Sequence, residues 1–99
     1  MKKYHIMLVK VIIVKPLANY KLWLKFNDDT EGVADLSHLS GKGVFKEWDE
    51  NGLFYGVKID PETDAIVWND RIDIDALNLY LKIKNITFKE FKEHQYATN

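Results

Sequence analysis

The sequence predicts an α+β domain: a small antiparallel or mixed sheet built from hairpins, with one or two C-terminal helices packed on it. Three observations predict this class. Segments with strand-like patterns come first, turn-forming residues separate them at hairpin spacing, and longer helical patterns appear only from residue 75 onward. Strands that precede helices, without alternating strand–helix units, are typical of α+β domains rather than of parallel sheets.

The first strand is expected within the nearly continuous apolar run of residues 6–14. Such a β-branched run without alternation is typical of a strand that is covered on both faces, so we expect it to be central in its sheet. Pro16 is expected to end it, because proline cannot donate a backbone hydrogen bond to a neighbouring strand.

A hairpin is expected over residues 20–36, with its turn in the Asn and Asp residues of segment 27–30. Its first strand alternates between two faces. The apolar face consists of Tyr20, Leu22, Leu24 and Phe26. The opposite face consists of Lys21, Trp23 and Lys25.

The middle of the chain is expected to hold a short helical turn at residues 44–48 and two further strands. The first of these strands covers residues 53–60, and a proline-led turn connects it to the second at residues 65–69. The inward side chains of the strand at residues 53–60 are expected to be Leu53, Tyr55, Val57 and Ile59.

Two helices are expected after the strands. Asp75 is a favourable N-cap for the first, because its carboxylate can accept from the free N–H groups of the opening turn. The apolar face of this helix is expected to contain Leu77, Tyr80 and Leu81. Thr87 and Glu90 form a capping-box pattern for a short second helix. The apolar face of the second helix is expected to contain Phe88 and Phe91.

The composition, with 46% apolar and 29% charged residues, is typical of a globular protein, and 99 residues fit a single domain. The lack of cysteine excludes disulfides, thiolate metal sites and a cysteine nucleophile, and it fits a reducing cytoplasm. No segment reaches the roughly 20 apolar residues of a membrane span. We therefore expect a cytoplasmic protein without a membrane partner.

The net charge of −1 conceals an uneven distribution. Residues 1–26 contain six lysines and no acid, whereas residues 60–75 contain six acids and one arginine. Such polarity can steer a charged partner, although charge runs also simply solvate a surface. The basic residues are too few, and too well balanced by acids, to indicate nucleic-acid binding from composition alone.

A candidate acidic patch consists of Arg71, Asp73 and Asp75, which alternate with apolar Ile72 and Ile74. Two carboxylates one strand step apart could hold a hard cation such as magnesium, which suggests a metal-assisted hydrolase. In the alternative interpretation, Asp73 pairs loosely with Arg71 and Asp75 caps the helix. No companion ligand pattern supports the metal, so we expect no metal or other cofactor.

Catalytic motifs are not evident elsewhere. The three histidines, His5, His38 and His94, are far apart and lack zinc-site spacing. The Ser-Gly-Lys-Gly segment at residues 40–43 lacks the spacing of a phosphate-binding loop. We therefore assign no catalytic residue.

A candidate binding face consists of Lys21, Trp23 and Lys25. An aromatic ring between two lysines could stack on a nucleic-acid base or anchor a protein partner. Alternatively, a helix covers this face and Trp23 belongs to the core. Trp48 and Trp68 follow apolar patterns and are expected in the core, each with an acceptor for its indole N–H.

The chain resembles the bacterial domain-of-unknown-function family 2442 over about residues 8–81. The resemblance rests on the Pro16 strand and hairpin, on segments 28–36 and 43–45, and on the stretch from Trp68 to Tyr80. It implies a compact α+β unit, with residues 82–99 as a short helical extension of the same domain. Similar proteins often have a second small gene beside theirs, in an arrangement like a toxin–antitoxin pair.

The leading functional hypothesis is a non-enzymatic module that binds another small protein or itself. The alternative is a nucleic-acid-binding regulator that uses the Lys21–Trp23–Lys25 face. A second alternative is the metal-assisted hydrolase at Asp73 and Asp75.

Overall fold

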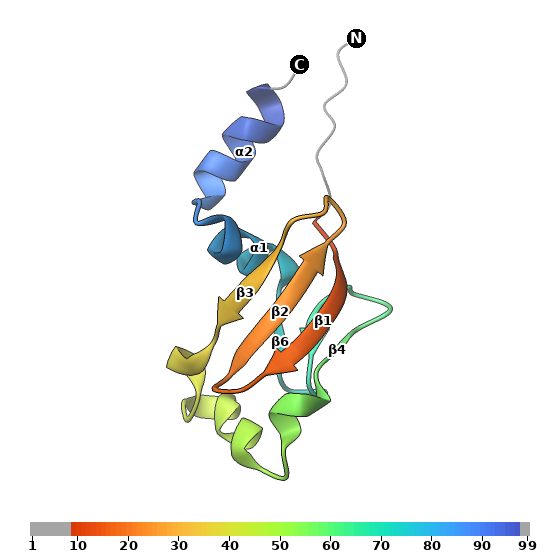
Figure 1. The fold of residues 1–99 in the computed structure, drawn as a ribbon, viewed down its shortest axis with the longest axis vertical. Helices are drawn as coiled ribbons and strands as arrows, with labels where there is room; N and C mark the ends of the chain where they lie inside the picture. The colour runs from red at the N-terminus through yellow and green to blue at the C-terminus, as the bar shows by residue number, and fades with distance from the viewer. Residues whose placement is uncertain (1–8, 98–99) are drawn as a thin grey trace.

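The computed structural model describes residues 9–97, and it describes side chains as far as residue 93. Two three-stranded antiparallel sheets lie within these residues (Figure 1). The first contains β1 (Val11–Leu17), β2 (Lys21–Phe26) and β3 (Glu31–Asp35). The second contains the short strands β4 (Lys58–Ile59), β5 (Ile66–Val67) and β6 (Asp73–Ile74). Three 3₁₀ helices connect the two sheets: η1 (Ser37–Leu39), η2 (Gly43–Asp49) and η3 (Leu53–Gly56). Two α-helices follow the second sheet, α1 (Ala76–Lys84) and α2 (Phe88–Ala97).

The predicted α+β class is confirmed, but the expected position of the first strand is wrong. The strand order is β1-β2-β3, so β2 is central and β1 lies at an edge. Ile13 is 40% exposed, because nothing among the described residues covers the outer side of this sheet. Pro16 lies inside β1 opposite Leu22, where an edge position tolerates its missing N–H. The expected start of this strand at residue 6 lies outside the described residues.

The hairpin of β2 and β3 is confirmed. Leu22, Leu24 and Phe26 have no exposed surface, so one face of β2 lies wholly in the core. In the turn, Asp29 adopts a left-handed conformation, and the Asp28 carboxylate accepts a hydrogen bond from the backbone N–H of Thr30. The turn is also tied to α1, because the Tyr80 hydroxyl donates to Asp28 over 2.7 Å.

The strand expected over residues 53–60 is mostly wrong. Residues 53–56 form the helix η3, and only Lys58 and Ile59 pair with β5. Consequently Phe54 is buried at 3% exposure, while Tyr55, which was expected to point inward, is 59% exposed. The helical turn expected at residues 44–48 is confirmed as η2.

An aromatic cluster of Trp48, Phe54 and Trp68 fills the space between the two sheets. The ring centroid of Trp48 lies 5.0 Å from those of both Phe54 and Trp68. As expected, the Trp68 indole N–H has an acceptor, the carbonyl oxygen of Phe54 at 2.9 Å. The corresponding expectation for Trp48 is wrong, because its indole N–H has no partner among the described residues.

The helix caps follow the sequence closely. The Asp75 carboxylate accepts from the Leu77 N–H at the start of α1. Thr87 and Glu90 exchange the two reciprocal bonds of a capping box, each 3.1 Å long, at the start of α2. The buried face of α1 is rotated from the expected one: it consists of Ala76, Leu79 and Tyr80, while Leu77 and Leu81 are only partly buried.

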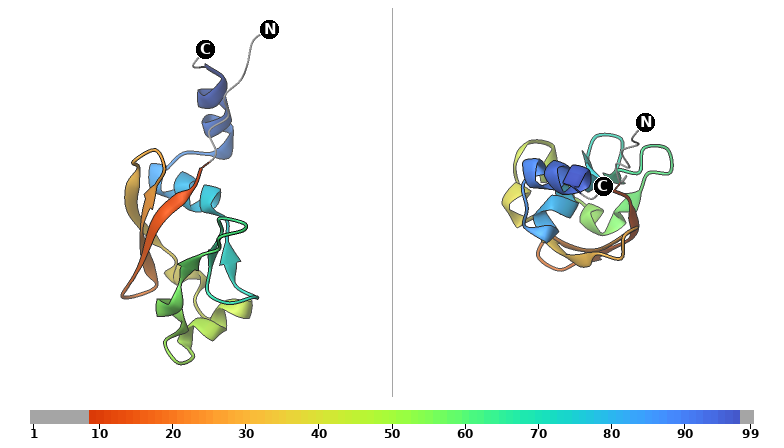
Figure 2. Two further views of the ribbon diagram at one scale, coloured as in Figure 1. Left: turned by 90° about the vertical axis from the view of Figure 1, so that its right-hand side faces the viewer. Right: turned by 90° about the horizontal axis from the view of Figure 1, so that it is seen from above.

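The two helices occupy different places. α1 packs against the inner side of β3, whereas α2 extends beyond the sheets (Figures 1 and 2). Of the two phenylalanines expected to face inward on α2, Phe91 is buried against the ring of Tyr80. The other, Phe88, is 52% exposed.

Gly32 permits the close approach of α1 to β3. A Cβ atom at this position would lie 2.8 Å from Cγ2 of Ile83 in α1, which is closer than side chains pack. We therefore expect Gly32→Ala to lower the free energy of unfolding by about 1–3 kcal/mol, measured by urea denaturation.

Gly56 is the matched control, because a Cβ atom there meets no atom within 4 Å. Gly56→Ala is expected to change the free energy of unfolding by no more than about 0.5 kcal/mol. Equal stability of the two variants would contradict the tight packing of α1 on β3.

Candidate functional site

The outer face of the first sheet is the candidate functional site. Its strand register brings nine side chains together in three cross-strand rows. We call this set the outer face; its rows are Ile13–Lys25–Glu31, Lys15–Trp23–Val33 and Leu17–Lys21–Asp35. Lys21, Trp23 and Lys25, the binding face expected from the sequence, form its central column.

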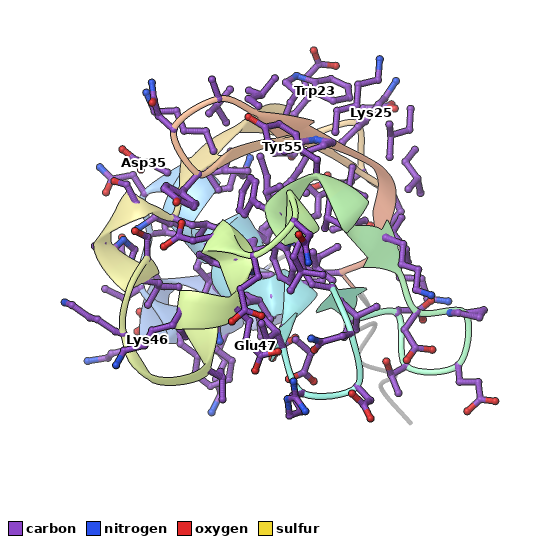
Figure 3. All side chains as sticks on the ribbon, turned by 90° about the horizontal axis from the view of Figure 1, so that it is seen from below. Trp23, Lys25, Asp35, Lys46, Glu47 and Tyr55 are labelled. Carbon is purple, nitrogen blue, oxygen red and sulfur yellow. The ribbon has the colours of Figure 1, made fainter. Side chains whose placement is uncertain are left out.

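Trp23 is partly buried by its neighbours on the outer face, and no helix within residues 9–97 covers it. Its alternative assignment to the core is therefore wrong, since α1 lies on the other side of the sheet. Figure 3 shows Trp23 and Lys25 projecting from the side of the sheet that faces away from the rest of the molecule. The Lys15 ammonium group lies over the indole, 5.5 Å from the ring centroid, in a cation–π contact.

Three aliphatic side chains are exposed around Trp23 on the outer face. They are Ile13, Leu17 and Val33, with exposed fractions of 40%, 37% and 50%. These three side chains do not belong to the hydrophobic core, so core packing does not explain why they are apolar. The outer face is therefore an aromatic centre with aliphatic neighbours, a composition that is typical of protein interfaces.

The lysines of the outer face have acidic neighbours. Lys25 lies directly opposite Glu31, and Lys21 lies directly opposite Asp35. The pKa of Asp35 is below its ordinary value, chiefly because the Ser37 side chain and backbone N–H bind its carboxylate, with a smaller contribution from Lys21. Three lysines and two acids leave the outer face with a formal charge of only +1.

The candidate acidic patch is arranged differently from the prediction. Arg71 does not pair with Asp73; its guanidinium binds the Glu47 carboxylate of η2 through two hydrogen bonds, of 3.1 and 2.5 Å. Asn69 supports this pair, because its amide donates to Glu47 and its carbonyl oxygen accepts from the Arg71 N–H. No local pattern indicates Glu47 as the partner of Arg71, because the two residues are 24 positions apart.

Asp73 and Asp75 line a shallow cavity of about 390 Å³ together with Asp64. Asp75 serves as the cap of α1, as expected. Among residues 9–93, whose side chains are described, no group of three His, Cys, Asp or Glu residues is arranged to hold a metal ion. His5 and His94 lie outside the residues whose side chains are described.

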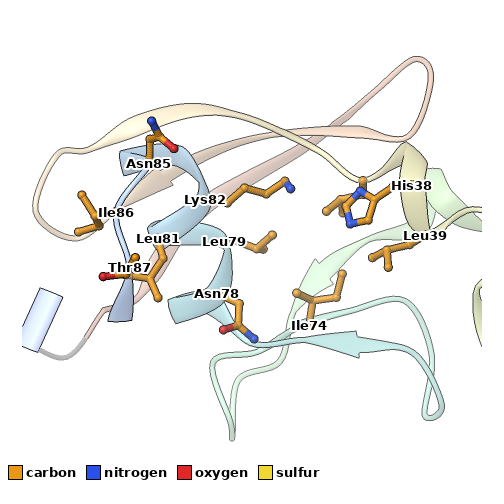
Figure 4. A pocket seen from close by; sticks show the side chains of 11 residues that line it. His38, Leu39, Ile74, Asn78, Leu79, Leu81, Lys82, Asn85, Ile86 and Thr87 are labelled. Atoms are coloured by element: carbon orange, nitrogen blue, oxygen red, sulfur yellow. The ribbon is translucent and has the colours of Figure 1, made fainter. Parts of the chain in front are cut away.

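A groove of about 590 Å³ lies between η1, β6 and α1 (Figure 4). Its apolar lining includes Leu36, Leu39 and Ile86, and the polar side chains of His38 and Lys82 stand at its rim. Residues 36–39 and 74–87 contribute to it, so no local pattern in the sequence indicates the groove.

A family model described as "Protein of unknown function (DUF2442)" matches residues 11–85. The chain belongs to the DUF2442 family. The match begins with β1 and ends immediately after α1, so it contains both sheets and the outer face of this DUF2442 domain. Among curated proteins, no significant match was found.

The DUF2442 domain is also similar to a crystal structure from Nitrosomonas europaea, described as a "Putative DNA Binding Protein". The TM-score is 0.73 and the two sequences are 19% identical. The match covers 100% of this chain and 65% of the other, so this chain spans about two thirds of that protein's length. An identity this low shows the shared fold alone. Separately, no helix within residues 9–97 is long and apolar enough to cross a bilayer.

The Arg71–Glu47 pair is expected to make the stability of the fold depend on pH. The hydrogen bonds and charge of Arg71 hold the pKa of Glu47 below its ordinary value of 4.5. A lowered pKa in the folded state stabilises the fold at neutral pH, and this stabilisation is lost as the pH falls through that pKa. Arg71→Gln is therefore expected to raise the pKa of Glu47, measured by carboxyl-carbon NMR titration, and to reduce stability more at neutral than at acidic pH.

Lys46→Gln is the charge-matched control, because Lys46 adjoins Glu47 in sequence but points away from it into solvent (Figure 3). It is expected to leave the Glu47 titration nearly unchanged. If both variants shift the Glu47 pKa equally, general charge rather than the specific pair determines it.

Proposed function

We propose that this DUF2442 domain is a non-enzymatic module that binds another protein through the outer face. One observation carries the proposal: the partly buried Trp23 lies among the exposed side chains of Ile13, Leu17 and Val33, while the surrounding charges largely compensate one another. Tryptophan is enriched among residues that dominate binding energy at protein interfaces. Aliphatic side chains on a sheet surface contribute nothing to phosphate binding but are removed from water by a protein partner.

The proposed partner is a different small protein, as in a two-gene pair of the toxin–antitoxin type. The family resemblance implies such gene pairs, and this implication motivates the choice of a different protein over a second copy of the chain. The outer face alone measures roughly 14 by 17 Å from strand spacing and rise. Stable interfaces bury about 800 Å² on each partner, so the partner must contact further surface around this face.

Ile13→Lys tests the proposal, with Val44→Lys as the matched control. Both residues are exposed aliphatics, at 40% and 45%, but Val44 lies on η2, away from the outer face. Each tagged full chain is expressed in its native host at native level and captured, and co-purifying proteins are quantified by intact mass. We expect the unchanged chain and Val44→Lys to retain one small protein in equimolar amount, and Ile13→Lys to lose most of it.

Two results would count against the proposal. One is a chain that is recovered alone and measures as a monomer by native mass spectrometry. The other is equal retention of the partner by Ile13→Lys and Val44→Lys, which would place the interface elsewhere on the domain. Recovery of a homo-oligomer alone would replace the proposed partner with a second copy.

Nucleic-acid binding is the second candidate, because the structural neighbour from Nitrosomonas europaea is described as a "Putative DNA Binding Protein". In this chain Lys21 and Lys25 could meet phosphates while Trp23 stacks on a base. Two features weaken the case: acids lie opposite both lysines, and Lys15 already covers one side of the indole ring.

Fluorescence anisotropy with labelled single- and double-stranded oligonucleotides tests this second candidate. Binding through these lysines must weaken steeply between about 50 and 200 mM salt, because phosphate contacts release counterions. Lys21→Glu with Lys25→Glu should then abolish it, whereas Lys42→Glu with Lys46→Glu, which removes the same charge from exposed positions near η2, should not. A lack of binding at low salt would eliminate the candidate.

A further inference from the structure

The free edge of β3 has unpaired backbone groups. Hydrogen bonds from the Phe26 N–H to the Thr30 carbonyl oxygen and from the Leu36 N–H to the Tyr20 carbonyl oxygen frame the β2–β3 ladder. Hydrogen-bonded and non-hydrogen-bonded pairs alternate in an antiparallel ladder. The hydrogen-bonded pairs between these two ends of the ladder are therefore Leu24–Gly32 and Leu22–Ala34. The N–H and C=O groups of the intervening residues of β3 therefore point outward, away from β2. These residues are Glu31, Val33 and Asp35.

No strand covers this edge among the described residues, because β3 ends the order β1-β2-β3. The opposite edge of the same sheet is protected. The register of β1 is interrupted next to Ile12, Pro16 lacks an N–H, and β4 lies close to β1. Irregular register, proline and covering segments are devices that prevent strand addition, and β3 has none of them.

The apolar groove lies along β3. Leu36, which lines the groove, directly follows the strand, and Figure 4 shows β3 running along one side of the groove above α1. An additional strand on this edge would point alternate side chains to the two faces of the sheet. Those on the inner face would enter the groove among Leu36, Leu39 and Ile86.

The charges on the two sides of this edge differ in sign. On the outer face, Glu31 and Asp35 flank Val33, and all three are exposed. On the inner side, Lys82 stands at the rim of the groove and disfavours basic residues there. The edge therefore matches a strand in which outward basic side chains alternate with inward apolar ones.

A second copy of β3 matches this edge poorly. Antiparallel pairing of two such strands centred on Val33 would place Glu31 of each copy opposite Asp35 of the other. Parallel in-register pairing would place identical acids side by side. Like charges directly opposite are destabilising in a sheet, so charge disfavours self-pairing and favours a basic strand from another protein.

We propose that β3 binds an extended segment of a partner protein as a fourth strand, with basic side chains opposite Glu31 and Asp35 and apolar side chains in the groove. Backbone hydrogen bonds supply affinity in such strand addition, and the alternating pockets supply specificity. The inference rests on the proposed protein-binding function and adds the contact surface that the outer face lacks. It names the class of partner segment: an extended stretch in which lysine or arginine alternates with aliphatic residues.

The probe is a synthetic seven-residue peptide in which lysine alternates with valine or leucine, added to the ¹⁵N-labelled full chain. We expect it to slow amide hydrogen exchange at Glu31, Val33 and Asp35, whose N–H groups point away from β2 and pair with no other described strand. Exchange at Gly32 and Ala34 is expected to change less, because these residues already pair with β2. A matched peptide with glutamate in place of lysine should not protect the edge.

Two controls separate strand addition from simple charge attraction. N-methylation of the peptide amides that face β3 should abolish binding, whereas methylation of the alternate amides should not. Glu31→Lys should weaken binding of the lysine peptide by roughly fivefold or more. Glu62→Lys, on the β4–β5 turn at the side of the molecule away from β3 (Figure 1), should leave it unchanged.

The proposal is overturned if the edge amides remain unprotected at saturating peptide, or if both methylated peptides bind equally. It is also overturned if the chain alone protects these amides as its concentration rises, because that result would show self-pairing. Failure here is distinct from failure of the proposed function. A partner that Ile13→Lys releases, together with unprotected β3 amides, would refute only the strand addition.

Discussion

Complete burial of one face of β2 is the constraint on which the rest of the structure depends. Leu22, Leu24 and Phe26 have no exposed surface, and each contributes about 1.5–3 kcal/mol by leaving water. Because side chains alternate along a strand, this burial forces Lys21, Trp23 and Lys25 to the opposite face. Burial of Leu22, Leu24 and Phe26 in the core therefore also determines which residues of β2 form the candidate binding surface.

The second sheet is too small to be stable alone, and aromatic side chains pack beside it. Its strands contain only two residues each, and Trp48, Phe54 and Trp68 pack together in the core beside them. Tyr20 extends this cluster: its ring packs on Trp48 and Phe54, and its hydroxyl donates to Asp49. These contacts hold Tyr20 in a left-handed conformation, φ 60°, that a bulky residue rarely adopts.

The features that could be predicted from the sequence are those encoded by neighbouring residues. The β2–β3 hairpin, the Asp75 cap and the Thr87–Glu90 capping box depend on residues within a few positions of one another, and all three are confirmed. The edge position of β1 and the helix η3 were mispredicted. An apolar run indicates a strand but not which of its faces is covered, and only the packing of distant segments decides that. The Arg71–Glu47 pair could not be found for the same reason.

The sequence by itself determined the α+β class, the family and the set of outward residues on β2, because period-two alternation and capping are local and chemically specific. Tertiary structure alone decided that α1 packs on the side of the sheet opposite Trp23, so that no helix among the described residues covers this ring. It also decided that Glu31 and Asp35 lie opposite Lys25 and Lys21, and that the β3 edge adjoins an apolar groove. Such relations depend on register and on which segment packs on which face, and both are set by the sum of many distant contacts rather than by any local pattern.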